Sequence, residues 1–591
     1  MSDYRAPIQD MRFVINELAG LHEVSQLPGF DEATPDLVDA VLDEAGKFAA
    51  DVVAPLNRVG DKEGCQLTGN GVTTPTGWKA AYDAFCEAGW HGIAQPTDFG
   101  GQGLPELLGN AVKEMLCAAN MSFSLAPILT NGAASALKIG ASDELKSIYL
   151  EKMVTGAWGG TMNLTEPQAG SDLALLRTRA EPQADGSYRV FGQKIFITYG
   201  DHDLTDNIVH LVLARLPDAP AGVKGISLFL VPKFMVNADG SLGERNDAHC
   251  VSIEHKLGIH ASPTCVMAFG DHGGAVGYLL GKPNRGLEYM FVMMNDARLA
   301  MGIQGVGIAE RSYQQALNYA RERKQGRDAV TGESLVTIDH HPDIKRMLML
   351  MRSRTEACRA LAYFASGLLD RAHAAPEAEA RQRHLALAEF MIPIVKGGST
   401  EMSIEVTSLG IQIHGGMGFI EETGAAQHWR DSRITTIYEG TTGIQANDLV
   451  FRKTLRDEGA VARQLFAEID ATVSALKSSA QPNIQAIGAR LGTALAAMQT
   501  ASDWLLANAK SNPSGVLLGA VTYLELATLV LGGWMMGRAA RVSADKLASG
   551  EGDGDFYRTK LATAHFYADH LLPLASAKAE TILAGDAALR G

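Results

Sequence analysis

The chain has 591 residues, 46% of them hydrophobic, and a formal net charge of −15. This length exceeds what one hydrophobic core usually supports, so we expect several domains. The acidic balance argues against nucleic acid as the main partner, because binding to a nucleic-acid backbone depends on lysine and arginine.

Two features of the sequence bear on the compartment. The six cysteines lie far apart and form no Cys-x-x-Cys pair, which predicts neither a metal site nor a disulfide framework. The chain begins Met-Ser-Asp-Tyr-Arg-Ala-Pro, without the charged and then apolar pattern of a signal peptide. We therefore expect a cytoplasmic protein with reduced thiols.

The first 155 residues are predicted to form an N-terminal helical domain. An apolar stripe at helical spacing runs through residues 36–45, and a second helix is expected from Trp78 onward. The segment Pro96-Thr-Asp-Phe-Gly-Gly-Gln-Gly103 interrupts this pattern and is predicted to be a loop.

Residues 156–283 change to the period of two that is typical of β-strands. Residues 187–198 are predicted to form two strands with a turn between them, and further strands are expected over 208–214, 225–232 and 265–269. No helical segment separates these strands, so the central domain should be an antiparallel β-barrel or sandwich.

Long helices return over residues 284–452, where we expect a four-helix bundle. Gly302, Gly305 and Gly307 lie inside one of these helices, and no strand precedes them. Close packing between helices therefore explains these glycines better than a phosphate-binding loop does. The fold class predicted for the whole chain is mostly α with one β domain.

Residues 453–591 are predicted to form an additional C-terminal helical domain. The apolar stretch over residues 515–537 is long enough to cross a membrane. Glu525 lies in its middle, however, and a carboxylate at the bilayer centre costs a few kcal/mol. We expect a buried bundle helix and no integral membrane segment.

A candidate general base lies in the stretch Ile437-Tyr-Glu-Gly-Thr441. Its carboxylate is in a predicted turn, after apolar and aromatic residues and before a glycine and a hydroxyl. Desolvation would raise the pKa of Glu439 toward the range that suits proton abstraction. Taken alone, an ordinary acidic turn is the simpler interpretation.

Three further stretches could bind a cofactor, although each could also be a plain loop or strand. Residues 162–172 combine hydroxyls with small residues, which suits a polar heterocycle or phosphate at a strand edge. Phe196-Ile-Thr198 offers an aromatic face and a hydroxyl. Residues 412–419 form a glycine cluster after a helix, where a ligand could approach the backbone closely.

In this order and on these element types, the four stretches resemble the acyl-CoA dehydrogenase family. The resemblance covers about residues 40–452, and only the larger members carry a C-terminal extension. Within the family, the extension and the run Glu322-Arg-Lys-Gln-Gly-Arg327 resemble the group that contains 3-methylmercaptopropionyl-CoA dehydrogenases.

The resemblance implies FAD-dependent α,β-dehydrogenation of an acyl-CoA thioester to the trans-2-enoyl-CoA, with electrons passed to an electron-transfer flavoprotein. The preferred substrate is 3-(methylthio)propanoyl-CoA, which would give 3-(methylthio)acryloyl-CoA. Glu439 would take the α-proton while the flavin takes the β-hydride. The backbone N–H of Glu439 and a ribityl hydroxyl would polarise the thioester carbonyl.

The resemblance also implies residue roles. Residues expected to bind FAD are Met162, Leu164, Thr165, Phe196, Thr198, Arg323, Gln325, Gln412, Gly416 and Thr441. Residues expected to bind the substrate are Ser171, Asp296, Arg298 and Gly440. Several of the FAD contacts would come from a neighbouring subunit, so a homodimer or homotetramer is expected.

Two positions depart from the family pattern. Arg323-Lys-Gln-Gly-Arg327 stands where relatives commonly have Arg-x-x-Phe-Gly, which weakens the local FAD assignment. Gly443 stands where many relatives have glutamine, so it is given no side-chain role.

Alternative functions remain. One is an acyl-CoA dehydrogenase for short or medium straight chains, and another is an acyl-CoA oxidase with oxygen as acceptor. A third is a non-catalytic flavoprotein that binds nucleic acid, against which the net charge and the presence of Glu439 both speak. A purely structural helical protein would not explain the ordered motifs.

Overall fold

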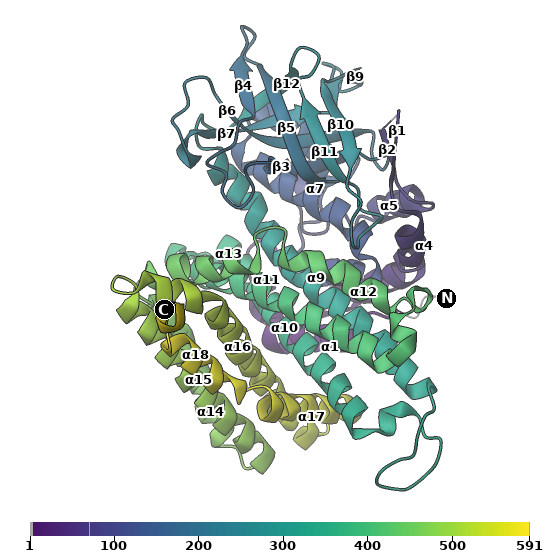
Figure 1. Ribbon diagram of the computed structural model, residues 1–591, viewed down its shortest axis with the longest axis vertical. Coiled ribbons are helices and arrows are strands. Elements are labelled where there is room, and N and C mark those ends of the chain that lie inside the picture. Colours follow the sequence, from purple (N-terminus) through teal and green to yellow (C-terminus); the bar gives the residue numbers. More distant parts are fainter. Residues whose placement is uncertain (1–3, 70, 590–591) are drawn as a thin grey trace. The chain divides into compact units, whose positions relative to one another are not determined.

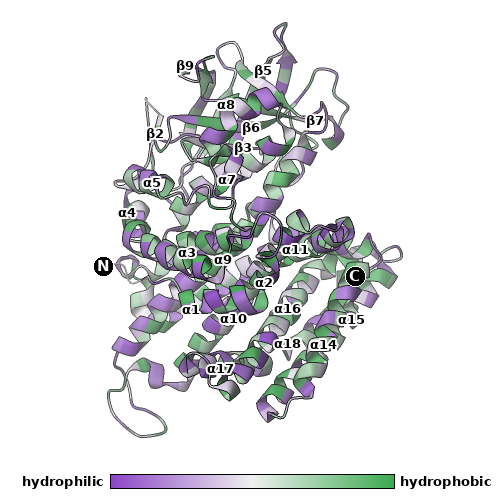
Figure 2. Ribbon diagram, turned by 180° about the vertical axis from the view of Figure 1, so that it is seen from behind, coloured by the Kyte–Doolittle hydropathy of each residue, from purple (hydrophilic) through white to green (hydrophobic). Residues whose placement is uncertain are grey.

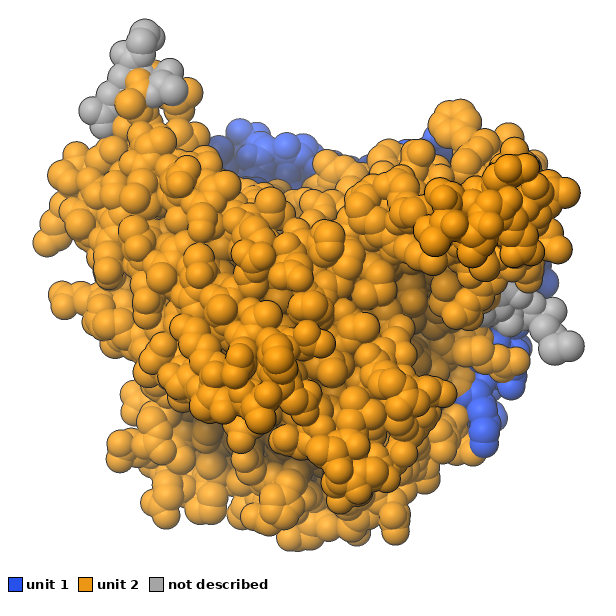
Figure 3. Space-filling view, turned by 90° about the horizontal axis from the view of Figure 1, so that it is seen from below, with its two compact units in different colours: residues 1–2, 47–104, 115–300 blue, residues 3–46, 105–114, 301–591 orange. Residues whose placement is uncertain are grey.

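The structure is a computed structural model that describes residues 4–69 and 71–589. The chain divides into two compact units, which Figure 3 colours separately. Unit 1 contains residues 47–104 and 115–300, and unit 2 contains residues 4–46, 105–114 and 301–589. Helices α6 (Glu106–Ala119) and α9 (Gly286–Glu322) contribute residues to both units. The domain boundaries expected from sequence stay predictions.

Unit 1 combines short helices with a β-sheet (Figure 1). Its helical segments are η2 (Ala49–Val53), α4 (Leu56–Glu63), α5 (Trp78–Glu87), η3 (Thr97–Phe99), α7 (Met121–Gly140), α8 (Asp143–Val154) and η4 (Val223–Gly225). Its strands are β1 (Gln66–Thr68), β2 (Gly71–Thr73), β3 (Trp158–Asn163), β4 (Arg179–Pro182), β5 (Tyr188–Thr198), β6 (Asn207–Arg215), β7 (Ile226–Pro232), β8 (Phe234–Val236), β9 (Leu242–Arg245), β10 (Ala248–Ile253), β11 (Thr264–Phe269) and β12 (Ala275–Leu280). The hairpins β1–β2 and β8–β9 were not expected from sequence.

The main sheet of unit 1 closes into a barrel. Its order is β10-β11-β5-β12-β7-β6-β3, and β4 pairs with both β5 and β6, which joins β4, β5, β12, β7 and β6 in a ring. Of the barrel or sandwich expected from sequence, the structure has the barrel. The pairing is not wholly antiparallel, because β6 runs parallel to β3 and, at Arg179 and Arg215, to β4. The chain returns from β3 to β6 through the β4–β5 hairpin and so reaches the same direction again.

Strand β5 corrects one expectation. Residues 187–198 were predicted to contain a turn, but Tyr188–Thr198 is a single strand that changes partners near Gly192. Gly192 has a φ of +150°, and a Cβ added there would lie 2.5 Å from Oγ1 of Thr178. The glycine therefore permits a bend and a close approach to the neighbouring segment. In the sequence, a glycine used in this way cannot be told from one that marks a turn.

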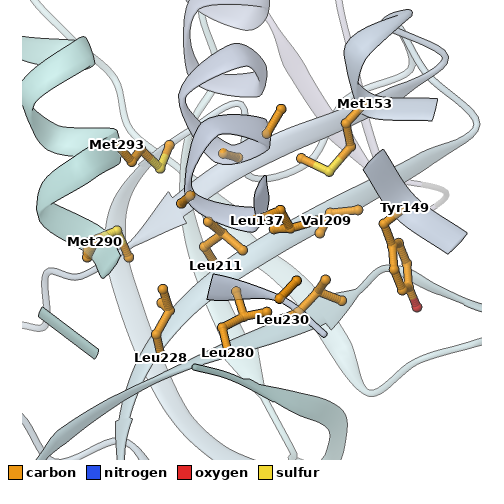
Figure 4. Packing of buried hydrophobic residues seen from close by; sticks show 14 of the residues in the cluster. Leu137, Tyr149, Met153, Val209, Leu211, Leu228, Leu230, Leu280, Met290 and Met293 are labelled. Atoms are coloured by element: carbon orange, nitrogen blue, oxygen red, sulfur yellow. The ribbon is translucent and has the colours of Figure 1, made fainter. Parts of the chain in front are cut away.

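One hydrophobic core of unit 1 lies between α7 and the barrel. Figure 4 shows Leu137 of α7 beside Val209 and Leu211 of β6, with Leu228 and Leu230 of β7 close by. Gly160 of β3 allows α7 to approach, because a Cβ added there would lie 2.7 Å from Cβ of Ala133. This packing fixes the end of β3, from which the predicted cofactor-binding segment continues.

Unit 2 is helical in the part of the chain described. Its N-terminal segments are α1 (Ile8–Phe13), η1 (Val14–Leu18), α2 (Leu21–Val24) and α3 (Pro35–Phe48), of which the last two residues belong to unit 1. The bundle segments are η5 (Ile338–His340), α10 (Pro342–Ala374), α11 (Ala378–His414), η6 (Gly415–Phe419), η7 (Glu421–Thr423), α12 (Ala425–Ser432), η8 (Arg433–Thr436), α13 (Thr442–Asn447) and η9 (Asp448–Leu455). The extension contains α14 (Ala460–Lys477), α15 (Pro482–Asn508), α16 (Pro513–Ser549), α17 (Gly554–His570), α18 (Leu574–Leu583) and η10 (Ala587–Leu589).

Glycines on α9 allow α11 to pack closely against it. A Cβ at Gly302 would lie 2.6 Å from Cγ1 of Val395, and one at Gly305 would lie 2.6 Å from the carbonyl oxygen of Ser399. The interpretation of these glycines as helix-packing residues is confirmed. Figure 2 shows hydrophobic and hydrophilic residues on the same helices, as expected for helices that bury one face.

Helix α16 is the one helix, among the described residues, that is long and apolar enough to cross a membrane. In its most apolar stretch, 61% of the residues are buried inside the protein. It contacts α10, α11 and α13 of the bundle as well as α15, α17 and α18 of the extension. Glu525, on α16, accepts a hydrogen bond from Nζ of Lys578 at 2.5 Å. Helix α16 is thus a central helix of unit 2.

A buried network of charges joins the extension to the bundle. Lys560 of α17 pairs with Asp10 and, at 2.7 Å, with Glu356 of α10. Arg359, one turn further along α10, binds Asp10 and also the carboxylates Glu114 and Glu310 at 2.6–2.9 Å. Because buried charges are stable only when paired, this network requires the extension and the N-terminal helix to be in place together.

Candidate active site

Glu439 lies in a tight loop between η8 and α13 of unit 2. Its φ is +54° and that of Gly440 is +89°, so two consecutive residues are left-handed. This conformation is favourable for glycine but costs about 1–2 kcal/mol for a residue with a side chain. Glu439 is half-buried. Strain of this kind is typical of functional sites when the surrounding structure holds it in place.

Three side-chain hydrogen bonds hold the backbone of this loop. Nζ of Lys396 donates to the carbonyl oxygens of Gly440, at 2.6 Å, and Thr435, at 2.9 Å. Nε2 of Gln445 donates to the carbonyl oxygen of Glu439 at 3.1 Å. Sequence reasoning missed both residues. A signal was available for Lys396, because it is the only charged residue in the apolar and glycine-rich run over 390–398.

The residues on either side of the loop are also fixed. The hydroxyl of Tyr438 donates to Oε1 of Gln304 on α9, and Oγ1 of Thr442 donates to Oε1 of Glu401 on α11 at 2.5 Å. Oγ1 of Thr441 accepts from the backbone N–H of Ile444 at 3.3 Å and caps α13. Glu439 is therefore attached to three helices.

The predicted flavin-binding residues of unit 1 lie on two adjacent chain segments. The backbone N–H of Ile195 donates to the carbonyl oxygen of Thr165 at 2.9 Å, which places the segment after β3 beside β5. The structure thereby brings Met162, Leu164 and Thr165 close in space to the segment that carries Phe196 and Thr198. Phe196 is 60% exposed and has a φ of +60°.

A buried ion pair supports these two segments. Lys194 donates to the carbonyl oxygen of Leu164 at 3.0 Å and to Oε1 of Glu166 at 2.8 Å. Burial alone would raise the pKa of Glu166, but the charge of Lys194 and hydrogen bonds from Thr178 and Arg177 lower it to about 2. Burial lowers the pKa of Lys194 to about 8 although the charge of Glu166 opposes this. Glu166 and Lys194 were not singled out from sequence as site residues.

The predicted substrate-binding residues differ in how deeply they are buried. Ser171 and Asp296 are exposed, whereas Arg298 is 6% exposed and donates to Oδ1 of Asn295 at 3.5 Å. Two residues along an α-helix correspond to about 200° of rotation around its axis, so the side chains of Asp296 and Arg298 face different sides of α9. The fourth, Gly440, belongs to the loop between η8 and α13 of unit 2 that carries Glu439 (residues 437–441), called the glutamate loop below.

The remaining predicted FAD-binding residues of unit 2 are exposed. Arg323 and Gln325 lie at the base of a hairpin, where the N–H of Ile338 donates to the carbonyl oxygen of Arg323 at 2.8 Å and that of Gln325 to Val336 at 3.0 Å. Gln412 and Gly416 are at the end of α11 and in η6. The same regions expose large apolar side chains, which are Val330, Leu335, Met417, Phe419 and Ile420.

Comparison with protein families gives four matches in order along the chain. Residues 36–157, 161–272 and 284–455 match the models of the N-terminal, middle and C-terminal domains of acyl-CoA dehydrogenases. Residues 465–590 match the model described as acetyl-CoA dehydrogenase C-terminal like.

Similar proteins match along nearly their whole length. The chain is 50% identical to the 3-methylmercaptopropionyl-CoA dehydrogenase of Ruegeria pomeroyi, over 97% of each chain. It is 36% identical to a butyryl-CoA dehydrogenase of Syntrophomonas wolfei, over 97% of this chain and 95% of the relative. The crystal structure of an acyl-CoA dehydrogenase from Bacillus anthracis complexed with FAD is 21% identical, with a TM-score of 0.74, over 96% and 92% of the two chains. The last similarity shows a shared fold.

Proposed function

Because this chain belongs to the acyl-CoA dehydrogenase family, we propose that it catalyses FAD-dependent α,β-dehydrogenation of 3-(methylthio)propanoyl-CoA to 3-(methylthio)acryloyl-CoA. The observation that carries this proposal is the glutamate loop of unit 2. It presents a half-buried carboxylate from a left-handed residue whose backbone is held by Lys396 and Gln445.

The residues of unit 1 fit FAD as the cofactor. An isoalloxazine has a flat apolar face and a polar rim, and the exposed Phe196 lies beside the hydroxyl-bearing Thr165 and Thr198. We assign Met162 and Leu164 to the same surface. Thr441, Arg323, Gln325, Gln412 and Gly416 are assigned to the rest of the cofactor. When bound, FAD accepts the hydride that leaves Cβ of the substrate.

Glu439 acts as the base in this proposal. A proton α to a thioester is only weakly acidic, so its removal needs a carboxylate fixed against Cα. Glu439 takes that proton, the electron pair of the Cα–H bond becomes the new double bond, and a hydride leaves Cβ. Gln445, which donates to the carbonyl oxygen of Glu439, holds the backbone from which the carboxylate is presented. Ser171, Asp296, Arg298 and Gly440 are assigned to binding of the acyl-CoA.

The decisive experiment replaces the base and follows the flavin. In Glu439→Gln, bound FAD should be retained, while anaerobic bleaching of its absorbance by the acyl-CoA should be lost. Glu458→Gln is the matched control, because Glu458 is also a glutamate with a φ of +54° but lies outside the loop and is exposed. Normal bleaching in the Glu439 variant would remove this residue from the mechanism.

The acyl group is the finer part of the proposal. The 50% identity to the Ruegeria pomeroyi relative favours the methylthio substrate, and the 36% identity to a butyryl-CoA dehydrogenase keeps short straight chains as the second candidate. Titration of the protein with 3-(methylthio)propanoyl-CoA, butyryl-CoA and octanoyl-CoA tests this choice. A higher kcat/KM for butyryl-CoA would reject the methylthio assignment.

An electron-transfer flavoprotein is the proposed electron acceptor. An oxidase would instead form hydrogen peroxide in air with each turnover, so a peroxide assay separates the two. A nucleic-acid-binding flavoprotein would shift duplex DNA in a gel at physiological salt and would not bleach. We expect little peroxide and no gel shift.

We further propose a cytoplasmic homodimer or homotetramer. The exposed apolar residues lie in the same two regions as Arg323, Gln325, Gln412 and Gly416, which supports burial of this surface against a second copy. Light scattering gives the oligomeric state. A monomer that holds FAD at full occupancy would contradict a cofactor site shared between subunits.

A further inference from the structure

Lys396 is a buried lysine in the middle of α11, and it has no assigned role. Its Nζ connects two backbone carbonyls, that of Thr435, four residues before Glu439, and that of Gly440, one residue after it. One ammonium group therefore closes the two ends of the segment that carries the glutamate. Hydrogen bonds from a charged donor are stronger than those between neutral groups, and this donor lies in a region shielded from water.

The backbone of α11 is unusual on both sides of Lys396. Pro393 lies three residues before it, inside the helix, and Gly397 and Gly398 follow it directly. Proline removes a helical hydrogen bond, and glycine is a poor helix former. This part of α11 is therefore weak by itself and depends on its neighbours for its position.

The neighbour at this point is α16 of the C-terminal extension. A Cβ added at Gly397 would lie 2.8 Å from Cδ1 of Leu524, and one at Gly398 would lie 2.2 Å from Oγ1 of Thr528. The two glycines thus let α16 approach the backbone of α11 beside Lys396. Helix α16 also contacts α13, which supplies Gln445, the other side chain that holds the loop.

We propose that Lys396 is a positioning residue for Glu439 and that α16 of the extension holds Lys396 in place through Gly397 and Gly398. The extension is then a structural part of the catalytic apparatus of unit 2, although no residue of α16 is assigned to the reacting atoms. This inference rests on the proposed function, because it takes Glu439 as the base.

The first test replaces Lys396 with methionine, which keeps the apolar stem of the side chain and removes the amine that makes both hydrogen bonds. With FAD bound, kcat should fall about 10- to 100-fold while KM changes little, because a small displacement of a base slows proton transfer more than it weakens binding. The kinetic isotope effect with α-deuterated substrate should rise. Amide hydrogen exchange over residues 435–441 should become faster in the protein without substrate.

Lys560→Met is the matched control. Lys560 is equally buried in unit 2, and its loss removes ion pairs to Asp10 and Glu356 rather than contacts to the loop. Thermal stability should fall in both variants, but the isotope effect and the exchange of residues 435–441 should change only in Lys396→Met. Equal values in the two variants would show that Lys396 is merely structural.

The second test addresses α16. Gly398→Ala should push α16 away from α11 and reproduce the rise in isotope effect. Adding Thr528→Ala should bring the isotope effect part of the way back to the wild-type value, because the hydroxyl and methyl of Thr528 are the atoms closest to the new Cβ. Gly519→Ala is the control within α16, since its added Cβ would make only an ordinary contact at 3.4 Å with Ile582. Unchanged exchange over 435–441 in Gly398→Ala would overturn the role of the extension.

The outcomes separate this inference from the proposed function. Loss of activity in Glu439→Gln together with a normal isotope effect in Lys396→Met would refute the positioning role and leave the function intact. Activity in Glu439→Gln would refute the function itself. If Lys396→Met does not fold, Gly398→Ala and the exchange measurement decide the question.

Discussion

Asp370 of α10 provides a stringent test of the electrostatics of unit 2. Its carboxylate is fully buried and accepts the backbone N–H groups of Glu106 and Leu107, at 2.7 and 2.9 Å, at the start of α6. Burial raises its pKa to about 7 from an ordinary value of 3.8, although the two N–H groups oppose the shift. Near neutral pH, the folded protein therefore holds protons on Asp370 that the unfolded chain has already released.

The sign and size of the effect follow from this shift. Because the folded pKa is the higher one, the contribution of Asp370 to stability is complete below pH 3.8 and is lost as the pH rises to about 7. Each pKa unit corresponds to about 1.4 kcal/mol. Because Asp370 is half-titrated in the folded protein at pH 7, the free energy of unfolding should fall by about 2 kcal/mol between pH 5 and pH 7 on account of Asp370 alone.

Asp370→Asn removes this dependence because asparagine does not titrate. Its amide nitrogen cannot accept, so one of the two N–H groups loses its partner, which costs about 1–3 kcal/mol at every pH. The variant should be less stable than the wild type at pH 5, and this difference in the free energy of unfolding should shrink by about 2 kcal/mol at pH 7. Urea unfolding followed by tryptophan fluorescence at the two pH values measures the difference. Parallel pH profiles of the two proteins would refute the assignment of a protonated Asp370.

Three further predictions concern the ion pairs and the cofactor. Lys560→Met leaves Asp10 and Glu356 without a buried cation and should lower the free energy of unfolding by about 3–5 kcal/mol, measured by urea unfolding, with Lys578→Met at a half-exposed pair as the milder control. Lys194→Met should lose FAD during purification, because the carbonyl of Leu164 and the carboxylate of Glu166 lose their common donor. The control is Lys233→Met, which removes an ion pair with Asp201 elsewhere in unit 1 and should keep the yellow colour of bound FAD. Arg323→Ala should also lower the FAD content, read from the absorbance at 450 nm, and a fully yellow variant would count against its role.

The barrel and the long helices could be predicted because each depends on a local pattern. The apolar runs over 208–214 and 226–232 form strands that are buried on both faces, and the apolar spacing of α10 and α11 follows from the helical turn. The turn expected near Gly192 was wrong for a local reason as well. Gly192 serves a close contact with Thr178, a residue in a different segment, and sequence alone does not distinguish that use of glycine from a turn.

The contacts that hold the glutamate loop could not be predicted, because they join residues distant in the chain. Lys396 is 44 residues from Gly440, and the two meet only because α11, α12 and η8 fold back on one another. A lysine in an apolar run indicates a buried partner but does not identify it. The parallel pairing of β3 with β6 is unpredictable for the same reason, since it depends on where the β4–β5 hairpin returns the chain.

Phe196 and Glu439 share an unusual backbone conformation. Both are non-glycine residues with positive φ, at +60° and +54°, and each has hydrogen bonds that hold the neighbouring backbone. A side chain in this region is strained, so the fold must stabilise it elsewhere, and Lys396 does this in unit 2 by donating to the carbonyl oxygen of Gly440, next to Glu439. In unit 1, Lys194 lies two residues before Phe196 and donates to the carbonyl oxygen of Leu164 in the adjacent segment. Loss of Lys396 should therefore relax the backbone around Glu439 toward an ordinary conformation and reduce catalysis even where the fold survives.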